Sequence, residues 1–358
     1  MNAQNQTNRR DFLRSSLIGG AAALAARWHV TSACARVIAP QAAQVTGHVA
    51  LTAGEDRADL AFKGLMTFQK SIAKAIGKKQ VVIKPNNVAI DNQLSASHAQ
   101  NLEGILEFLK TIGKTNIVIA ESAANGPTLE GFANYGYDRL ASKYGAKLVD
   151  LDQAGFEIVQ CFDETDIQPH ACRMSKVLLD PNRFIISAAK MKTHDRVVTT
   201  LSLKNIVVGA PIKDAGFRWD SKSKPGARND KPLTHGNGFR GINYNLYALA
   251  GRLHPHLSVI DGFEGMEGEG PVGGTPVPHK VCVVSQDWLA ADRVAVELMG
   301  IDFRKVGYLN YCGRAGLGES DLARIEVIGP MLSDHIKAYK LAANIDEQLV
   351  WREKLKKV

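Results

Sequence analysis

The chain has 358 residues, of which 45% are hydrophobic and 22% charged, a composition typical of a globular protein. These values exclude a disordered or collagen-like chain, and the length suffices for one large α/β domain. The formal net charge is +8, but the basic residues are scattered rather than arranged in a stripe with interleaved aromatic residues, so we expect no nucleic-acid partner.

The first 35 residues have the pattern of a twin-arginine export signal. Arg9 and Arg10 precede an apolar run at residues 17–26, and residues 33–35 offer small side chains for cleavage. This run is too short to cross a bilayer of roughly 30 Å as a helix, so no stable membrane span is expected. We therefore predict an exported, periplasmic protein whose partner during export is the twin-arginine machinery.

Cleavage after Ala35 would leave four cysteines. No two of them have the CxxC spacing of a zinc ribbon or an iron–sulfur cluster, so no iron–sulfur cluster is expected in this chain. Cys161 and Cys172 lie in two segments predicted to form a hairpin, where they either form a disulfide or remain free thiols. Cys34 is an alternative lipid acceptor, but Thr31 stands where a lipobox carries an aliphatic residue.

Residues 36–56 are predicted to be a linker, followed by a domain at residues 57–330. In this domain, segments with helical spacing of apolar residues alternate with short β-branched runs. The alternation predicts an α/β fold with a mostly parallel mixed sheet flanked by helices, in a single compact domain after the N-terminal signal segment. The predicted helices are 57–76, 101–112, 129–144 and 290–299, and the predicted strands are 81–83, 116–120, 147–151, 156–162, 171–179, 184–189, 257–260, 281–284 and 324–328.

Two stretches interrupt this alternation. Residues 213–243 are polar, and a loop of this length inside a compact domain is usually functional or disordered. Residues 262–274 hold six glycines among carboxylates. Beyond the domain, residues 331–358 are predicted to form a basic amphipathic helix that packs on it through Leu341, Ile345, Leu349 and Trp351.

Charged and amide side chains follow four of the predicted strands. Ligands of open α/β sheets bind in the crevice outside the carboxyl ends of the strands, so we expect these side chains to meet in one crevice. They are Lys84 and Asn86 after strand 81–83, Glu121 after strand 116–120, Lys190, Lys192 and His194 after strand 184–189, and Asp261 after strand 257–260.

The segment from Lys190 to Asn205 is the most informative part of this set. Its three lysines, His194 and Asn205 predict an anion site for phosphate or carboxylate, with Lys204 as a point charge and Asn205 as a neutral donor. A solvated basic surface is the alternative interpretation. It fits less well, because the apolar residues at 201–208 require burial.

The glycine-rich stretch from Asp261 to Pro271 is the acidic counterpart. Glycines allow the backbone to approach a ligand closely, while carboxylates act as general bases or bind hard divalent cations. We assign His194, Asp261 and Glu264 to catalysis. Glu267 and His235 are candidate ligands of a possible divalent metal.

The order of these motifs resembles the family called domain of unknown function 362. The motifs are Val82-Ile-Lys-Pro-Asn86, Lys190-Met-Lys-Thr-His194, Leu201-Ser-Leu-Lys-Asn205, Asp261-Gly-Phe-Glu-Gly-Met-Glu-Gly-Glu-Gly-Pro271 and the segment Asp292–Gly300. The resemblance implies a single α/β domain, which in some relatives is fused to iron–sulfur ferredoxin modules. No such motif occurs here, and the family's name implies no activity.

Two functional hypotheses follow from the residues. The first is an exported enzyme that acts on a small anionic substrate, held by Lys84, Asn86, Glu121, Lys190, Lys192, Lys204 and Asn205, with His194 as the proton shuttle. The alternative is a non-catalytic periplasmic binding protein or an accessory protein for a redox system.

Overall fold

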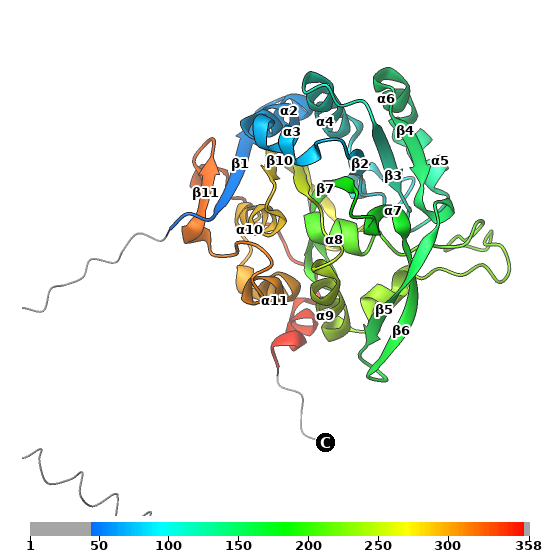
Figure 1. Ribbon diagram of the computed structural model, residues 1–358. Coiled ribbons are helices and arrows are strands. Elements are labelled where there is room, and N and C mark those ends of the chain that lie inside the picture. Colours follow the sequence, from blue (N-terminus) through cyan, green and yellow to red (C-terminus); the bar gives the residue numbers. More distant parts are fainter. Residues whose placement is uncertain (1–43, 354–358) are drawn as a thin grey trace, which may run out of the picture. The chain divides into compact units, whose positions relative to one another are not determined.

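A nine-stranded sheet runs through the centre of the structure, a computed structural model that describes residues 44–353. Neighbouring strands pair in parallel, except that β10 is antiparallel to both of its neighbours and β8 to β7. The predicted α/β fold with a mostly parallel mixed sheet is confirmed (Figure 1). In spatial order the strands are β11 (Ile325–Ile328), β1 (Gly47–Ala53), β10 (Thr275–Ser285), β9 (Leu257–Glu267), β7 (Arg183–His194), β2 (Gln80–Lys84), β3 (Ile117–Glu121) and β4 (Lys147–Asp150), with β8 (Val198–Thr200) beside β7.

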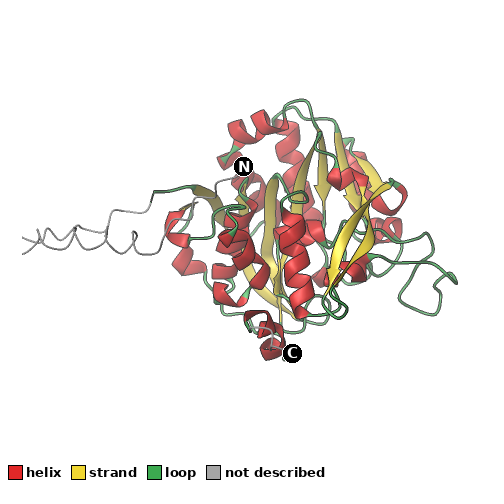
Figure 2. Cartoon of the chain, turned by 60° about the horizontal axis from the view of Figure 1, so that its bottom comes forward, coloured by secondary structure: helices red, strands yellow, loops and turns green. Residues whose placement is uncertain are grey.

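Helices cover both faces of this sheet (Figure 2). Successive strand residues point to opposite faces, so Ala188 joins one apolar core and Ala189 the other. The first face packs against α2 (Arg57–Thr67), α3 (Gln69–Ile76), α4 (Ala99–Thr111), α5 (Thr128–Asn134) and α6 (Tyr137–Tyr144). The second packs against α7 (Lys176–Leu179), α8 (Ser202–Val207), α9 (Phe239–Ala250), α10 (Trp288–Leu298) and α11 (Gly307–Arg314).

A separate two-stranded hairpin consists of β5 (Phe156–Asp163) and β6 (Gln168–Ser175). Cys161 pairs with His170 and Cys172 with Val159, so the two cysteines are offset across the hairpin rather than opposite each other. Both are buried and free, as are Cys282 and Cys312. Of the two alternatives for this hairpin, the structure shows free thiols.

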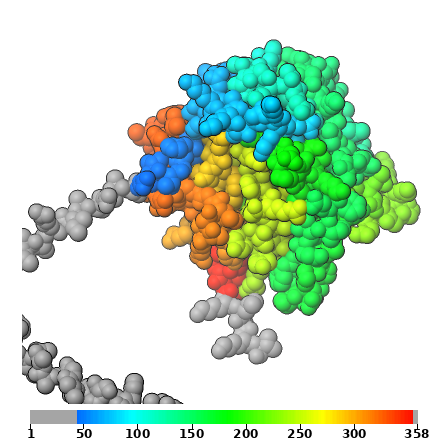
Figure 3. Space-filling view, in the orientation of Figure 1, coloured from blue at the N-terminus to red at the C-terminus, as the bar shows by residue number. Residues whose placement is uncertain are grey.

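The domain begins earlier than the sequence indicates. The signal at residues 1–35 and the start of the predicted linker lie outside the described residues, but the rest of that linker contains strand β1. Val49, Ala50 and Leu51 are fully buried, because β10 and β11 pair with the two edges of β1 and helices cover both faces of the sheet. In Figures 1 and 3 this strand, in blue, lies against the orange segment that contains β11.

Two predicted helices are interrupted. The segment 57–76 divides at Phe68 into α2 and α3, and the segment 129–144 divides at Gly136, whose φ of 73° no α-helix accommodates. The polar stretch 213–243 ends inside α9. Residues 262–267 of the glycine-rich stretch continue strand β9, and residues 268–274 form the turn that leads to β10.

Residues 331–353 lie against the domain but do not form one helix. The segment contains the short helices η6 (Leu332–His335), α12 (Ile345–Gln348) and η7 (Leu349–Arg352). Between η6 and α12 its backbone forms hydrogen bonds with the rest of the domain instead of helical ones. Tyr339 N donates to Met299 O at 3.0 Å, and Lys340 O accepts from Gly268 N at 2.8 Å. Of the predicted inward residues, Leu341 and Ile345 pack half-buried against the core, and Leu349 and Trp351 are half-buried as well. The buried side chains of the segment are instead Tyr339, Ala342 and Gln348, because tertiary bonds replace the helical ones.

Among residues 44–353, no helix combines the length and the apolar character that crossing a membrane requires.

Candidate functional site

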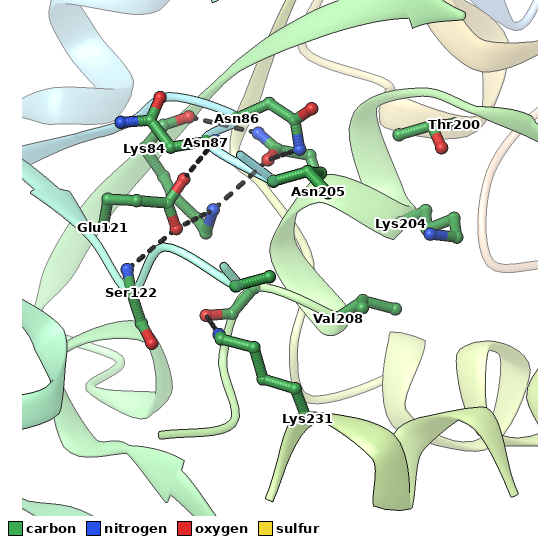
Figure 4. A pocket seen from close by; sticks show the side chains of 13 residues that line it. Lys84, Asn86, Asn87, Glu121, Ser122, Thr200, Lys204, Asn205, Val208 and Lys231 are labelled. Carbon is green, nitrogen blue, oxygen red and sulfur yellow. Dashed lines mark hydrogen bonds and ion pairs between the residues drawn. The ribbon is translucent and has the colours of Figure 1, made fainter. Parts of the chain in front are cut away.

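Lys84, at the carboxyl end of β2, is the centre of a buried network (Figure 4). Its Nζ lies 2.7 Å from Glu121 Oε1 at the end of β3 and donates to Asn205 Oδ1 at 3.2 Å. Asn86 Nδ2 donates to the same Asn205 oxygen at 3.1 Å. The structure thus brings together four of the predicted site residues, which come from β2, β3 and α8.

The carboxylate of Glu121 is fully engaged within this network. Besides Lys84, it accepts from the backbone N–H groups of Asn87 at 2.9 Å and Ser122 at 2.8 Å. Burial lowers the pKa of Lys84, and the neighbouring Glu121 opposes that shift. Lys84 and Glu121 therefore form the base of the site, called its floor below, and neither charge is free to bind a ligand.

Two features place α8 against this floor. Asp292 of α10 accepts from the first backbone N–H groups of the helix, Ser202 at 2.7 Å and Leu203 at 3.1 Å. These groups have no partner inside the helix, so the carboxylate caps it. After the helix, Gly209 packs directly on Lys84, where an added Cβ would overlap the Lys84 Cε atom.

A cavity of about 600 Å³ lies beside the network. Three cationic side chains line it, together with two histidines and a single carboxylate, Asp195. Two of the cations, Lys204 and Lys231, also line the smaller pocket around Lys84, so the two hollows adjoin. The third cation is Arg196, and the histidines are His194 and His235.

Lys204 is buried but unpaired within the described part of the chain. In Figure 4 its Nζ stands apart from the network, and no bond joins it to another side chain drawn there. Burial lowers its pKa to about 7, with only the charge of Asp195 acting against the shift. Such a lysine is a cation without a counterion, positioned at a cavity.

Lys231 differs in having backbone acceptors. Its Nζ donates to Pro211 O at 2.7 Å and to Gly209 O at 3.4 Å. Burial lowers its pKa to about 7 as well, while the charge of Asp152 opposes the shift. Since a lysine ammonium has three donors, these bonds leave capacity for a ligand.

The two histidines lie close together, with ring centroids 6.5 Å apart. Arg196 N donates to His194 Nδ1 at 3.0 Å, so the proton of the neutral ring is on Nε2. Burial, reinforced by the charge of Lys204, lowers the pKa of His194 well below its ordinary value. His194 therefore offers a neutral N–H donor, and burial likewise lowers the pKa of His235 to about 4.

Lys192 does not line the cavity, although it precedes His194 by two residues. Its buried Nζ donates to Ser95 O at 2.7 Å and to Pro271 O at 3.3 Å. Burial, together with the charge of Lys204, lowers its pKa well below the ordinary value. The Lys192 side chain thus links the segments that contain Ser95 and Pro271. The register in which β7 pairs with β9 shifts between Lys190 and Lys192.

Burial lowers the pKa of Lys190, and the charges of Asp261 and Glu264 act against this shift, so these three residues lie close to one another. They do not line the cavity, and the prediction of one shared crevice is wrong for them. Lys190 and Asp261 are paired positions of β7 and β9 that face the α2 and α4 side of the sheet, opposite α8. There Asp261 Oδ1 lies 3.5 Å from Arg57 Nε. The catalytic set His194, Asp261 and Glu264 is therefore not assembled around the cavity.

Glu267 and His235 are also not brought together as metal ligands. Glu267 accepts from Lys340 N at 2.9 Å at the C-terminal segment, whereas His235 lines the cavity. Within residues 44–353, the one close group of three candidate ligands is Asp163, Asp166 and His170. Its carboxylates already accept hydrogen bonds that hold the β5–β6 turn.

Most of the cavity wall was not predicted, and its unpredicted charged and aromatic residues are Asp195, Arg196, Trp219 and Lys231. Arg196 follows His194 by two residues, and extending the basic segment past the strand end would have included it. Trp219 and Lys231 lie in the polar stretch 213–243, where no periodicity indicates which side chains turn inward.

These observations define a class: an α/β protein with a cationic cavity at the carboxyl ends of its parallel strands. The chain belongs to the family described as a domain of unknown function (DUF362), whose model matches residues 81–297. The matched region begins in β2 and ends in α10, so it contains the strands and the helix that form the site.

Two individual proteins are also similar. A thylakoid-associated protein of Synechocystis sp. is 26% identical over 130 residues, and the match covers 36% of each chain, about a third of the relative's length. A crystal structure of a protein from Thermotoga maritima covers 66% of this chain and 58% of its own, with a TM-score of 0.38 and 11% identity. The second likeness is too loose to carry an argument.

Proposed function

We propose that this protein binds a small anion, a phosphate or a carboxylate, in the cavity beside Lys84 and acts on it as an enzyme. The observation that carries the proposal is the ammonium of Lys204, which lies on a buried side chain at the junction of two adjoining hollows and has no ion-pair partner among the described residues. A buried cation without a partner is costly, and an anionic ligand would supply the missing charge.

The other groups in the wall divide into binding and proton transfer. Lys231 is a second charge for the anion, and His194 donates its Nε2–H. Because the pKa of Lys204 is about 7, the ammonium that holds the anion is also acidic enough to donate its proton to the substrate near neutral pH. Proton donation to an anionic substrate, by Lys204 or by His194 Nε2, is the chemistry that these two groups support.

The test measures binding and turnover separately. Calorimetric titration with inorganic phosphate and with acetate should show binding that Lys204→Met abolishes. Lys70→Met removes the same charge from an exposed site on α3 and should leave the affinity unchanged. Equal affinity in all three proteins would refute the proposal.

Turnover distinguishes the two functional hypotheses. We expect conversion of at least one member of a panel of small phosphate esters and carboxylates, followed by NMR, and its loss in Lys204→Met. Tight binding without conversion of any compound would favour the alternative, a non-catalytic periplasmic binding or accessory protein.

We also propose that the chain is exported by the twin-arginine pathway. The support is the order of Arg9, Arg10 and the apolar run at residues 17–26, which lie outside the described residues. The name of the thylakoid-associated relative is in keeping with a protein that works at or beyond a membrane. Replacing both arginines by lysine should keep the protein in the cytoplasmic fraction, and unchanged export would refute this route.

A further inference from the structure

The cavity has an aromatic wall that a simple anion does not require. Trp219 lines it from the segment between α8 and α9, and 59% of this side chain is exposed. The loop that carries it projects from the body of the domain (Figures 1 and 3). Large apolar side chains scattered on a surface are common, so exposure alone says little about Trp219.

The position of the indole is fixed, however. Its Nε1–H donates to Ala124 O, just after β3, at 2.9 Å. The ring of Phe217 meets it edge-on, with centroids 5.2 Å apart and an interplanar angle of 89°. Arg218, the residue before Trp219, reaches Glu130 of α5 at 3.5 Å. These contacts hold a flat aromatic surface at the cavity while leaving more than half of it uncovered.

The cavity is also larger than inorganic phosphate or acetate needs. A volume of about 600 Å³ lies in the range of roughly 300–1,000 Å³ typical of sites for extended organic ligands. The charges of Lys204, Lys231 and Arg196 are accompanied by the apolar side chains of Val88 and Pro232. The three cationic side chains suit an anionic group of a ligand, and the apolar side chains suit an apolar part of the same ligand.

We propose that the ligand is an aryl anion, in which a phosphate or carboxylate is joined to a flat aromatic ring that stacks on Trp219. This inference rests on the proposed function, because it assumes that the lysines hold the anionic group. The ring is favoured over an alkyl chain because the exposed surface is planar and held in place. Stacked aromatic pairs gain free energy beyond the area that they bury.

The experiment compares two phosphates of equal charge, methyl phosphate and phenyl phosphate, by calorimetry on the full chain. Wild-type protein should bind phenyl phosphate between about twofold and tenfold more tightly, the range that aromatic stacking provides. Trp219→Ala should abolish this preference while leaving the affinity for methyl phosphate unchanged. Trp219→Phe keeps a ring and should retain most of the preference.

Tyr244→Ala is the matched control, because Tyr244 is also an exposed aromatic residue, on α9, and should not affect either affinity. Circular dichroism establishes that each variant is folded. Equal binding of the two phosphates by the wild type, or a preference that survives in Trp219→Ala, would overturn the inference and leave the proposed function intact. Acetate and benzoate are compared in the same way to cover the carboxylates, and binding of none of these four anions would refute both.

Discussion

Lys204 is expected to destabilise the protein in the absence of its ligand. Replacing it by methionine, which has a similar length and no charge, should therefore raise the free energy of unfolding. The size of the effect follows from the pKa of Lys204, which burial lowers from 10.5 to about 7. Each pKa unit corresponds to about 1.4 kcal/mol of differential stability between the protonation states.

The sign of the pH dependence is determined by proton binding. Between pH 7 and pH 10.5 the unfolded chain binds a proton at Lys204 that the folded protein does not, so stability rises with pH in this window. Below about pH 7 the folded state carries the buried ammonium and the full penalty applies. The advantage of Lys204→Met should therefore fall from roughly 4 kcal/mol at pH 7.5 to roughly 1 kcal/mol at pH 9.5.

Urea unfolding of the wild type, Lys204→Met and Lys70→Met at these two pH values provides the measurement. The control removes an exposed charge and should follow the wild type at both. Subtracting the profiles isolates Lys204 from the other buried lysines. If Lys204→Met is less stable than the wild type, or if the two profiles are parallel, the ammonium is not buried without a partner as described.

Three further predictions concern the surroundings of Lys204. The affinity for phosphate should fall as the pH rises above about 7, because the anion binds the charged form of the Lys204 amine. Calorimetry in buffers of different ionisation enthalpy should show that a proton is taken up on binding, and an affinity that does not depend on pH would contradict this prediction. Lys84→Met should lower the free energy of unfolding by about 3–5 kcal/mol, because it leaves the carboxylate of Glu121 buried without its cation. A change below about 1 kcal/mol in urea unfolding would show that the Lys84–Glu121 pair does not stabilise the fold. Gly209→Ala should displace Lys84 and lower the free energy of unfolding by about 1–3 kcal/mol, which a thermal melt would detect. An unchanged midpoint would show that Gly209 and Lys84 are not in close contact.

The sequence was sufficient to predict the mostly parallel sheet and the residues that meet in the network around Lys84. Lys84 and Glu121 follow short apolar runs, and the rule that ligands bind at the carboxyl ends of parallel strands requires only that both strands run in the same direction. Asn205 could be included because the apolar residues around it required burial. All three depend on local patterns that a single sequence contains.

The position of Asp261 depended on information that the sequence does not contain. Strand β9 is buried on both faces, with Val259 in one core and Ile260 in the other, so its residues show no alternation of polar and apolar character. Without that alternation the face of Asp261 could not be determined. Strand β1 was missed for a related reason, because the neighbours that bury it are distant in the sequence.

The placement of β1 also constrains the order of events during synthesis. This strand lies between β10 and β11, which the ribosome makes after most of the chain, and a hydrogen bond joins Thr52 Oγ1 to Cys282 O across 230 positions. Until β10 is made the first strand has neither of its neighbours, and until β11 is made one of its edges stays unpaired. The sheet can therefore be completed only after residue 328 has been made, and any factor that recognises the finished domain acts after that point.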